Sequence, residues 1–429
     1  MPRPIIINNT IKKFDKKIKV EGDKSLSIRF VLLASQAIGK SKAYNLLKSE
    51  DVISTINCLK KLGVKIRWNK KSDYCEINGN GLNSYVYRKN LTLNGNNSGT
   101  CVRLLTSLLI NSSKKIKIIG DKSLSKRDMK RIIDPLKEFG ATFYPKNKNT
   151  LPLHIKGSDY LTPINYVELK GSSQCKSSVM LAALLTNGET KLKCKPSRNH
   201  TELLFKYLKI PIEIKKRKNF EIIKVKGRQN FKAFNYNIPS DISSSAFFIV
   251  LTILSKNSKL ILEKVGVNKS RAGVIDVLNK MGAKIVLKNK KNYKGEKIAD
   301  IHVRSSKTLK SINCPSKLNS SAIDEFLIIF LAAAKAKGVS YFKNLDELNK
   351  KESRRLDWGS KILRMMGVKN QLIGNHGIKI WGQPNLKLNN KYEIKNYLKD
   401  HRVMAMSTIA ALTLGGKWKI HNPESIKTS

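Results

Sequence analysis

The stretch Gly22-Asp23-Lys24-Ser25-Leu26-Ser27-Ile28-Arg29 decides how the whole sequence is interpreted. A short β-rich segment at residues 18–20 precedes it and a largely apolar run at residues 30–38 follows it, which predicts a strand that passes into the N-terminus of a helix. Free backbone N–H groups and the positive end of the helix dipole make such a turn a natural place for an anion. Lys24 and Arg29 add full charges. For one such turn alone, the simpler interpretation is an Asp or Ser N-cap with solvated basic residues.

The turn belongs to a pattern that recurs along the chain: an apolar helix, a Gly-, Asn- or Lys-containing turn and a short β-rich strand. The apolar helices of this pattern begin near Phe30, Arg103, Val179, Phe247, Leu327 and Met404. A period of roughly 75 residues over the whole chain indicates a repeat architecture. Within the period, an amphipathic helix closed by Leu-Gly or an equivalent passes into a β run. Each repeat is therefore predicted to be β-α-β-α-β-β, with the sixth ending at Ser429 before its second helix.

Six such repeats predict an α/β protein of two domains with three repeats each, and a single six-repeat ring or solenoid is the alternative. A chain of 429 residues is too long for one small core. Residues 237–241 fall midway and carry a helix-breaking proline, so a hinge is predicted there. Domain I is predicted to comprise residues 1–21 and 241–429, and domain II residues 22–240. The N-terminal strand is expected to complete the last repeat of domain I, which gives two chain crossings.

Net charge narrows the classes of partner. The chain has 83 Lys and Arg against 31 Asp and Glu, a formal charge of +52, which suggests nucleic acid, a membrane surface or small anionic ligands. Lys, Asn and Ile are abundant in every part of the sequence, without a confined basic tail. This distribution favours a compositional bias over a polyanion partner. Nucleic-acid binding is therefore not expected and stays an alternative function.

Cysteine and histidine spacing predicts neither a metal site nor a cofactor. The six cysteines show no C-x-x-C pair and the six histidines no H-E-x-x-H spacing, which leaves a disulfide framework and a metal cluster unsupported and indicates a reducing compartment. The N-terminal apolar run is too short for a signal peptide, and the longest apolar runs, residues 246–254 and 326–334, are about half a membrane span. We therefore expect a cytoplasmic monomer without a membrane partner.

Superposing the repeats aligns the turns at twelve predicted helix N-termini, which carry hydroxyls, amides and mostly basic residues. Before the first helices stand residues 23–29, 97–103, 172–176, 240–244, 321–325 and 400–402, and before the second helices residues 48–50, 122–127, 196–200, 268–271, 351–355 and 424–427. Each Ser, Asn or Asp alone is explained by N-capping. If the helices of each domain run parallel, these turns converge on an interdomain cleft with a strongly positive potential. Small, multiply anionic substrates such as phosphates and carboxylates are then expected, because Arg grips both in a bidentate manner.

Two acids stand among these basic turns. Asp324 and Glu352 are predicted at the same helix starts, and a carboxylate that faces a cationic cleft could accept a proton from a substrate hydroxyl. Capping is the alternative role for both. His401 is either a proton carrier or a structural histidine beside Arg402.

Motifs along nearly the whole chain carry a resemblance to one family. They are GDKSLSIR (22–29), LLKSEDV (46–52), NSGTCVRLL (97–105), SLSKRDMKRIIDPL (123–136), SSQCKS (172–177), SRNHTE (197–202), SDISSSAFF (240–248), IDE (323–325), KESRR (351–355) and DHRVMAMS (400–407). Together they resemble the 5-enolpyruvylshikimate-3-phosphate synthase family. The resemblance implies a two-domain inside-out α/β barrel with three β-α-β-α-β-β repeats per domain. It also implies transfer of the enolpyruvyl group of phosphoenolpyruvate to the 5-hydroxyl of shikimate 3-phosphate, with release of phosphate and without a metal or a covalent enzyme adduct.

Matched motif by motif, the resemblance implies substrate contacts at the same turns. Shikimate 3-phosphate is expected to contact Lys24, Ser25, Arg29, Ser172, Ser173, Gln174, Ser197, Asp324 and Lys351, with Arg198 nearby. Phosphoenolpyruvate is expected to contact Lys24, Gly99, Arg127, Gln174, Arg355, Arg402 and Lys427. Asp324 is the expected base on the 5-hydroxyl, and Lys24 and Glu352 are candidates for proton exchange at C3 of phosphoenolpyruvate.

Two departures from the family pattern bear on these roles. Arg354 stands where the family has Asp in K-E-S-D-R, which puts a second arginine beside Arg355 and the orientation of Arg355 in question. The sequence ends at Ser429, where the family continues with Phe-Pro and a final helix that is expected to complete the packing of one domain.

The nearest alternative enzyme is UDP-N-acetylglucosamine enolpyruvyl transferase, whose family uses a reactive Cys in a mobile loop. In this sequence Cys101 and Cys175 are predicted at helix starts, and the D-H-R motif at residues 400–402 favours the shikimate enzyme.

Overall fold

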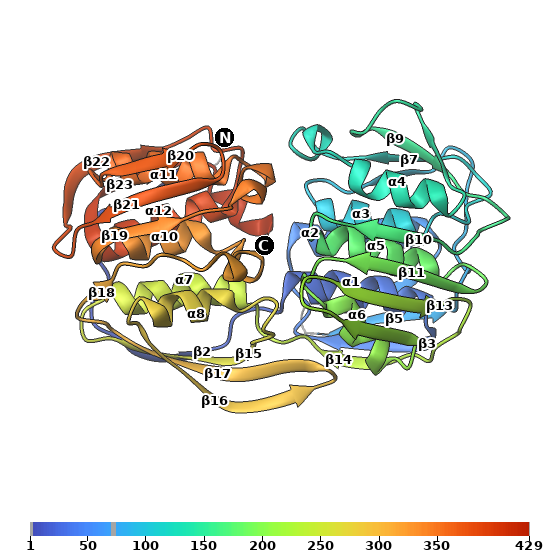
Figure 1. The fold of residues 1–429 in the computed structure, drawn as a ribbon, viewed down its shortest axis with the longest axis horizontal. Coiled ribbons are helices and arrows are strands. Elements are labelled where there is room, and N and C mark those ends of the chain that lie inside the picture. Colours follow the sequence, from blue (N-terminus) through green and yellow to red (C-terminus); the bar gives the residue numbers. More distant parts are fainter. Residues whose placement is uncertain (1–2, 70–73, 429) are drawn as a thin grey trace. The chain divides into compact units, whose positions relative to one another are not determined.

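The computed structural model describes residues 3–69 and 74–428. Its strands form small sheets that combine parallel and antiparallel pairs. In these residues the strands form six sheets, five of four strands and one of three (Figure 1). The chain separates into unit 1, comprising Met1–Glu21, Pro239–Tyr293 and Lys297–Ser429, and unit 2, comprising Gly22–Ile238 and Lys294–Glu296. Met1, Pro2 and Ser429, which the predicted domain boundaries include, lie outside the described residues. Sequence reasoning did not anticipate the grouping of Lys294–Glu296 with unit 2.

The sheets of unit 2 repeat one pairing order. Its strands are β3 (Ile38–Tyr44), β4 (Lys65–Asn69), β5 (Tyr74–Asn80), β6 (Thr92–Asn94), β7 (Ile116–Ile119), β8 (Thr142–Tyr144), β9 (Leu153–Lys156), β10 (Asn165–Glu168), β11 (Glu189–Cys194), β12 (Ile212–Lys216), β13 (Glu221–Lys226) and β14 (Asn235–Asn237). They form the orders β14-β3-β5-β4, β6-β7-β9-β8 and β10-β11-β13-β12. In each order the first pair is parallel and the other two pairs are antiparallel. A parallel pair needs a crossover connection, which a helix supplies.

Helices of unit 2 alternate between interior and amphipathic types. They are α1 (Lys24–Gln36), α2 (Glu50–Lys61), α3 (Gly99–Ser107), α4 (Lys130–Glu138), α5 (Ser173–Ala183) and α6 (His200–Tyr207), with a 3₁₀ turn, η1 (Leu124–Lys126), before α4. Every residue of α1 from Leu26 onward is buried, as is every residue of α5 from Cys175 onward. The helix α3 contacts both α1 and α5, and Arg29 of α1 donates a hydrogen bond to Ser177 of α5. A helix with a long apolar run is expected in such an interior position, and the polar residues that α1 and α5 also bury require partners there.

Within the described part of the chain, unit 1 also contains three sheets with helices between their strands, two sheets of four strands and one of three. Its strands are β1 (Ile5–Ile7), β2 (Asp15–Ile18), β15 (Lys259–Gly266), β16 (Lys284–Tyr293), β17 (Glu296–Arg304, whose first residue groups with unit 2), β18 (Leu309–Lys310), β19 (Ala336–Phe342), β20 (Asn370–Ile373), β21 (Gly377–Gly382), β22 (Leu388–Ile394) and β23 (Gly415–Ile420). Its helices are α7 (Ile242–Leu254), α8 (Gly273–Lys280), α9 (Asn319–Ala322), α10 (Phe326–Ala334), α11 (Arg355–Met365) and α12 (His401–Leu414), with 3₁₀ turns η2 (Ser316–Leu318), η3 (Asp346–Lys350) and η4 (Pro423–Thr428). All residues of α10 are buried, and this helix contacts α7 and α12.

The N-terminal segment supplies two strands, where the sequence predicted one. β1 pairs antiparallel with β23, in the last sheet of unit 1. β2 pairs parallel with β15, where Ile18 lies opposite Leu262. The predicted β segment at residues 18–20 is therefore displaced toward the N-terminus: β2 is Asp15–Ile18, and its ladder with β15 begins beside the hydrogen bond from Lys259 N to Phe14 O.

Gly22 stands where the chain passes into unit 2, in a space that admits no side chain. A Cβ atom at this position would lie 2.0 Å from the backbone oxygen of Asn45 and 2.8 Å from Cγ2 of Ile238. Asn45 Nδ2 also donates to Ile238 O at 2.9 Å. Gly22 is the first residue of unit 2 and Ile238 is the last residue of its main segment. These two residues thus pack together, with Asn45 beside them.

Candidate active site

The start of α1 is capped and charged as its sequence predicts. Asp23 Oδ1 accepts a hydrogen bond from Leu26 N at 2.8 Å, so the N-cap interpretation is correct for Asp23. Lys24 begins the helix, and its Nζ lies 3.3 Å from Asp51 Oδ2 in the first turn of α2. Ser25 is half-buried. The starts of α1 and α2 are therefore joined by an ion pair, which the sequence did not indicate.

Arg29 is buried and connects three helices. Its Nε donates to Thr201 Oγ1 on α6 at 2.8 Å, and its Nη2 donates to Ser177 Oγ on α5 at 2.8 Å. Its Nη1 donates to the backbone oxygen of Ser25 at 3.1 Å. Burial lowers the pKa of Arg29 to about 10, although the Glu202 and Asp23 charges act in the opposite direction. Arg29 thus fixes the first turn of α6 against α1 and α5.

Gly99 begins α3 between two guanidinium groups. A Cβ at Gly99 would lie 3.1 Å from Arg103 Nη1 and 3.3 Å from Arg127 Nη1. Arg127 Nη2 donates to Asn97 Oδ1 at 2.9 Å and to Ser123 Oγ at 3.2 Å. This turn combines a helix N-terminus with two cations, an arrangement suited to an anion. Sequence reasoning gave Arg103 no substrate contact, although its i+4 spacing from Gly99 puts both on one helix face.

Gln174 joins the start of α5 to α3. Its Oε1 accepts from Arg103 Nη1 at 2.6 Å, and its Nε2 donates to Thr100 Oγ1 at 3.0 Å. Ser172 caps α5 by accepting from Cys175 N at 3.2 Å. Two predicted contacts of different repeats, Gly99 and Gln174, are thereby brought to one place through Arg103.

A second arginine that the sequence analysis left unassigned also lies at this turn. Arg131 Nη1 of α4 lies 3.5 Å from Ser172 Oγ. Its position inside the SLSKRDMKR motif is the sequence signal that could have identified it.

Lys176, counted among the basic residues of its turn, belongs to a buried ion cluster. Its Nζ lies 2.6 Å from Glu202 Oε1 and 3.6 Å from Glu221 Oε2, with 0% of its side chain exposed. It also donates to the backbone oxygen of Ser197 at 3.3 Å. Lys176 therefore holds the loop before α6, and its charge is compensated by carboxylates.

In unit 1, three cations surround the carboxylate of Asp324. Lys351 Nζ lies 3.3 Å away, Arg355 Nη1 3.5 Å and Arg271 Nη1 3.6 Å. The Asp324 side chain is 13% exposed. It follows α9 and precedes α10, so two short helical segments hold the carboxylate against the basic groups.

Arg355 is oriented by carboxylates. Its Nε lies 2.9 Å from Asp400 Oδ2, and its Nη2 donates to Glu352 Oε2. Burial would lower the pKa of Arg355, but the charges of Asp400 and Glu352 outweigh it and raise the pKa above its ordinary value. Asp400 also caps α12 by accepting from Arg402 N at 3.0 Å. One carboxylate thus positions two of the predicted phosphoenolpyruvate contacts.

Arg354 does not disturb this arrangement, contrary to the concern raised by the sequence. Its exposed guanidinium pairs with Asp357 and lies 3.3 Å from Asn375 Oδ1, so it is directed away from Arg355. In the K-E-S-R-R motif Arg355 therefore keeps its orientation, because Arg354 has partners of its own, Asp357 on α11 and Asn375 after β20.

Arg402 lies in a buried network around Glu325. Arg402 Nη1 is 3.7 Å from Glu325 Oε1, and Arg271 Nη1 is 3.1 Å from the same oxygen. Ser243 Oγ, at the start of α7, donates to Glu325 and accepts from Arg271. From the sequence, neither Glu325 nor Arg271 was given a site role, because each is only one charged residue among several polar residues in its turn.

The two remaining predicted residues of unit 1 lie near the end of the chain. His401 is buried, and its Nδ1 lies 3.2 Å from Thr428 Oγ1 on η4, which accords with the structural alternative for this histidine. Lys427 is exposed on η4. The sixth repeat, expected to end before its second helix, carries this 3₁₀ turn at the corresponding position.

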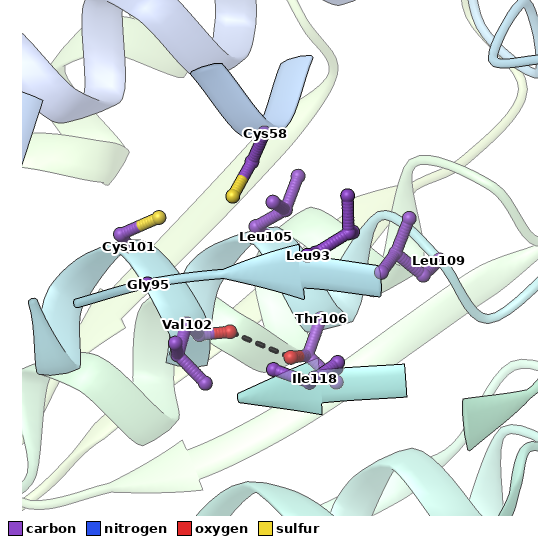
Figure 2. A pocket seen from close by; sticks show the side chains of 9 residues that line it. All are labelled: Cys58, Leu93, Gly95, Cys101, Val102, Leu105, Thr106, Leu109 and Ile118. Atoms are coloured by element: carbon purple, nitrogen blue, oxygen red, sulfur yellow. Dashed lines mark hydrogen bonds between the residues drawn. The ribbon is translucent and has the colours of Figure 1, made fainter. Parts of the chain in front are cut away.

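The cysteines at the helix starts are enclosed. Cys58 and Cys101 line a cavity of about 10 Å³ with Leu93, Gly95 and other apolar side chains of unit 2 (Figure 2). The Cys58 thiol and burial raise the pKa of Cys101 well above its ordinary value, and burial raises the pKa of Cys175 to about 12. A reactive cysteine is normally accessible and has a lowered pKa. The thiols of Cys101 and Cys175 are therefore neither accessible nor easily ionised, whereas the reactive cysteine of UDP-N-acetylglucosamine enolpyruvyl transferase would need both properties.

Residues 3–69 and 74–428, which the structure describes, contain neither a candidate metal site nor a candidate membrane span. Among these residues, no group of three or more His, Cys, Asp or Glu side chains is arranged to hold a metal ion. Within the same part of the chain, no helix has both the length and the apolar character needed to span a membrane.

Comparison with solved structures first defines the fold as that of the enolpyruvyl transferases. The enolpyruvyl transferase NikO from Streptomyces tendae has a TM-score of 0.76 at 14% identity, covering 100% of this chain and 95% of that chain. EPSP synthase from Acinetobacter baumannii has a TM-score of 0.86 at 34% identity, covering 100% of this chain and 96% of that chain. The predicted α/β class is confirmed.

Sequence comparison then identifies the family. The chain matches EPSP synthase (3-phosphoshikimate 1-carboxyvinyltransferase) over residues 8–429. It is 39% identical to the 3-phosphoshikimate 1-carboxyvinyltransferase of Ruthia magnifica, covering 96% of this chain and 92% of the relative, and 34% identical to that of Petrotoga mobilis, covering 97% and 95%. The chain belongs to the EPSP synthase family. The predicted enolpyruvyl transfer of the shikimate pathway is thereby confirmed, and neither alternative function is supported.

Proposed function

We propose that the turns described above hold the two substrates of this transfer. Shikimate 3-phosphate is assigned to Lys24, Ser25, Arg29, Ser172, Ser173, Gln174, Ser197, Asp324 and Lys351. Phosphoenolpyruvate is assigned to Lys24, Gly99, Arg127, Gln174, Arg355, Arg402 and Lys427. Family membership over almost the whole chain and the concentration of cations at these helix starts support both assignments. Arg103 and Arg131, which share the turns of Gly99 and Ser172, are added as candidates.

The catalytic proposal rests on the three cations that contact the Asp324 carboxylate. This carboxylate is partly exposed, and Lys351, Arg355 and Arg271 hold it in place. The same three cations attract an anionic substrate, which brings its hydroxyl close to the base. Asp324 is therefore assigned as the base that takes the proton of the 5-hydroxyl of shikimate 3-phosphate.

The reaction then proceeds by addition and elimination. As Asp324 takes the proton, the 5-oxygen forms a bond to C2 of phosphoenolpyruvate while C3 gains a proton and becomes a methyl group. In the second step the C2–O bond to phosphate breaks, the methyl group loses a proton, and the vinyl double bond is restored. Lys24 and Glu352 are assigned to the proton exchange at C3. Glu352 pairs with Arg355, so its carboxylate lies among the groups assigned to phosphoenolpyruvate.

Arginines supply most of the charge that phosphoenolpyruvate and the departing phosphate require. The guanidinium groups of Arg127 and Arg355 are held by hydrogen bonds or ion pairs to neighbouring side chains, so their donors are already oriented. Preorganised donors stabilise developing charge without reorganisation at the moment of reaction.

The finer description of the fold belongs to the same proposal. We assign an inside-out α/β barrel of six β-α-β-α-β-β repeats, three in each of two domains, residues 1–21 with 241–429 and residues 22–240. The repeated pairing order of the sheets and the buried first helices support it. A monomer in the cytoplasm is the proposed state, which size-exclusion chromatography with light scattering would test.

Phosphate release tests the function directly. The purified protein is incubated with phosphoenolpyruvate, with shikimate 3-phosphate, and with both, and inorganic phosphate is measured. Release is expected only when both substrates are present. Release from phosphoenolpyruvate alone, or none with both, would contradict the proposal.

Two variants test the substrate assignments within this assay. Ser173→Ala is expected to raise the KM for shikimate 3-phosphate and to leave that for phosphoenolpyruvate unchanged. Arg127→Lys is expected to raise the KM for phosphoenolpyruvate, because Lys cannot reproduce the planar fork. Arg88→Lys, at an exposed position of unit 2, is the matched control and should match the wild type.

A further inference from the structure

Three consecutive residues at the start of α6 each bind a partner from a different part of the chain. His200 Nδ1 lies 2.7 Å from Glu296 Oε1, Thr201 accepts from Arg29, and Glu202 pairs with Lys176. All three are buried. The first turn of α6 is therefore the point at which the buried polar groups of α1 and α5 and the residue Glu296 meet.

Glu296 reaches this turn from a distant segment. It follows the connection between β16 and β17, and the residues Lys294–Glu296 group with unit 2. Lys294 Nζ lies 5.0 Å from the ring centre of Tyr207 on α6 and 5.7 Å from that of Tyr236. It also donates to the backbone oxygen of Asn235. The short connection is thus anchored on both α6 and β14.

Burial makes the His200–Glu296 contact consequential. The two side chains are only 3% and 1% exposed. A charged or hydrogen-bonding group removed from water in this way costs several kcal/mol unless a partner compensates it. The field of Glu296 also reaches Arg29, where it opposes the effect of burial on the pKa of that residue.

The loop that precedes α6 carries an assigned contact. Ser197 lies three residues before His200, and its backbone oxygen accepts from the buried Lys176. Arg29, also assigned to shikimate 3-phosphate, bonds to Thr201 next to His200. A shift in the first turn of α6 would therefore displace both assigned contacts together.

We propose that Glu296 is a positioning residue for the shikimate 3-phosphate site, acting through His200 on the first turn of α6. The proposal rests on the assignment of that substrate to Arg29 and Ser197 made above. Glu296 does not touch substrate. It holds the imidazole, and the imidazole holds the turn from which Thr201 and Glu202 reach Arg29 and Lys176.

A double-mutant cycle tests the proposal. Glu296→Gln preserves shape and removes the charge, and His200→Phe preserves a planar ring and removes both nitrogens. Glu296→Gln is expected to raise the KM for shikimate 3-phosphate about tenfold, the effect of one hydrogen bond to a charged group, with kcat and the KM for phosphoenolpyruvate within about twofold of wild type. The double variant should be no worse than the poorer single variant, because the two residues act in one chain of contacts.

Glu393→Gln is the matched control. It removes the charge from another histidine–glutamate pair, His421 Nε2 to Glu393 Oε1 at 2.8 Å, whose side chains are 31% and 41% exposed. Exposed pairs of this kind contribute about 0–1 kcal/mol. All three kinetic constants of this variant should match the wild type.

Three outcomes would overturn the proposal. The KM for shikimate 3-phosphate could be unchanged in Glu296→Gln, or kcat and both KM values could worsen by the same factor. The third outcome is that the effects of the two single variants add in the double variant. If Glu296→Gln does not fold, Glu296→Asp replaces it, retains the charge on a shorter side chain, and must show the same selective rise. The Ser173→Ala variant separates this proposal from the substrate assignment. If Ser173→Ala fails to raise the same KM, the assignment itself is wrong; if it succeeds while Glu296→Gln has no effect, only the positioning role is wrong.

Discussion

Lys351 Nζ lies 3.3 Å from Asp324 Oδ1, and this pair is one of three contacts between a cation and the Asp324 carboxylate. Arg355 and Arg271 approach the same carboxylate from other elements of unit 1. Neutralising Asp324 therefore leaves these three cations in place and removes one negative charge from beside them, so binding of anions and the chemical step should respond differently.

Asp324→Ala should lose most of kcat while substrate binding survives. General base catalysis contributes about 10²–10⁴-fold in rate, so a loss of this size is expected. Binding of the anionic substrates should be unchanged or tighter, because three cations lose a competing carboxylate. Turnover with saturating substrates and equilibrium binding of shikimate 3-phosphate measure the two effects. Asp15→Ala, in an exposed pair with Lys259, is the control; near-normal turnover in Asp324→Ala would rule out the base role.

Adjacent arginines of the K-E-S-R-R motif should respond differently to the same substitution. Arg355→Lys keeps the charge but loses the oriented fork that binds Asp400, and hydrogen bonds to charged groups contribute about 1.5–3 kcal/mol each. The KM for phosphoenolpyruvate should therefore rise at least tenfold. Arg354→Lys alters only exposed contacts, those with Asp357 and Asn375, and should stay within about twofold of wild type. Equal kinetics for the two variants would show that Arg355 has no special part in binding.

Local capping is the part of the structure that the sequence predicted well. Asp23, Ser98, Ser172, Asp241 and Asp400 all cap their helices through side-chain oxygens, as expected for these residue types before apolar runs. The repeat pattern likewise located the interior helices, because each carries a long apolar run.

Partners of buried charges could not be predicted in the same way. Lys176 looked like a basic residue of a binding turn, yet it pairs with Glu202 on the next helix. Glu296 lies 96 positions from His200 and gives no local signal. Such pairings depend on how β-strands and helices pack in three dimensions, and neither hydrophobic period nor turn composition carries that information.

Gly22→Ala should destabilise unit 2 more than an ordinary glycine substitution does. Its new Cβ would lie 2.0 Å from the backbone oxygen of Asn45, and overpacking of this kind costs about 1–3 kcal/mol or more. Gly282→Ala is the comparison, since a Cβ there meets nothing within 4 Å and only the positive φ of 87° opposes it, which costs about 1–2 kcal/mol. Urea unfolding of both variants gives the two free energies. A Gly22→Ala protein as stable as wild type would mean that the backbone near Asn45 yields easily.

Alkaline pH should reveal the buried thiol of Cys175. Burial raises its pKa to about 12 in the folded protein, whereas an unfolded cysteine titrates near about 8.5. Because the folded-state pKa is the higher one, the contribution of this thiol to stability is complete below about pH 8.5 and is lost as the pH rises toward about 12. Between pH 7 and pH 10 this loss amounts to about 2 kcal/mol.

Comparison with variants isolates that loss from the titration of the many lysines, which all forms of the protein share. The free energy of unfolding of Cys175→Ala, measured in urea with a reductant present, should rise by about 2 kcal/mol relative to wild type between pH 7 and pH 10, because the variant has no thiol to ionise on unfolding. Ser178→Ala removes a buried hydroxyl from the same helix that titrates in neither state, so its difference from wild type should not change with pH. Parallel pH profiles for Cys175→Ala and wild type would mean that the thiol ionises as readily in the folded chain as in the unfolded one.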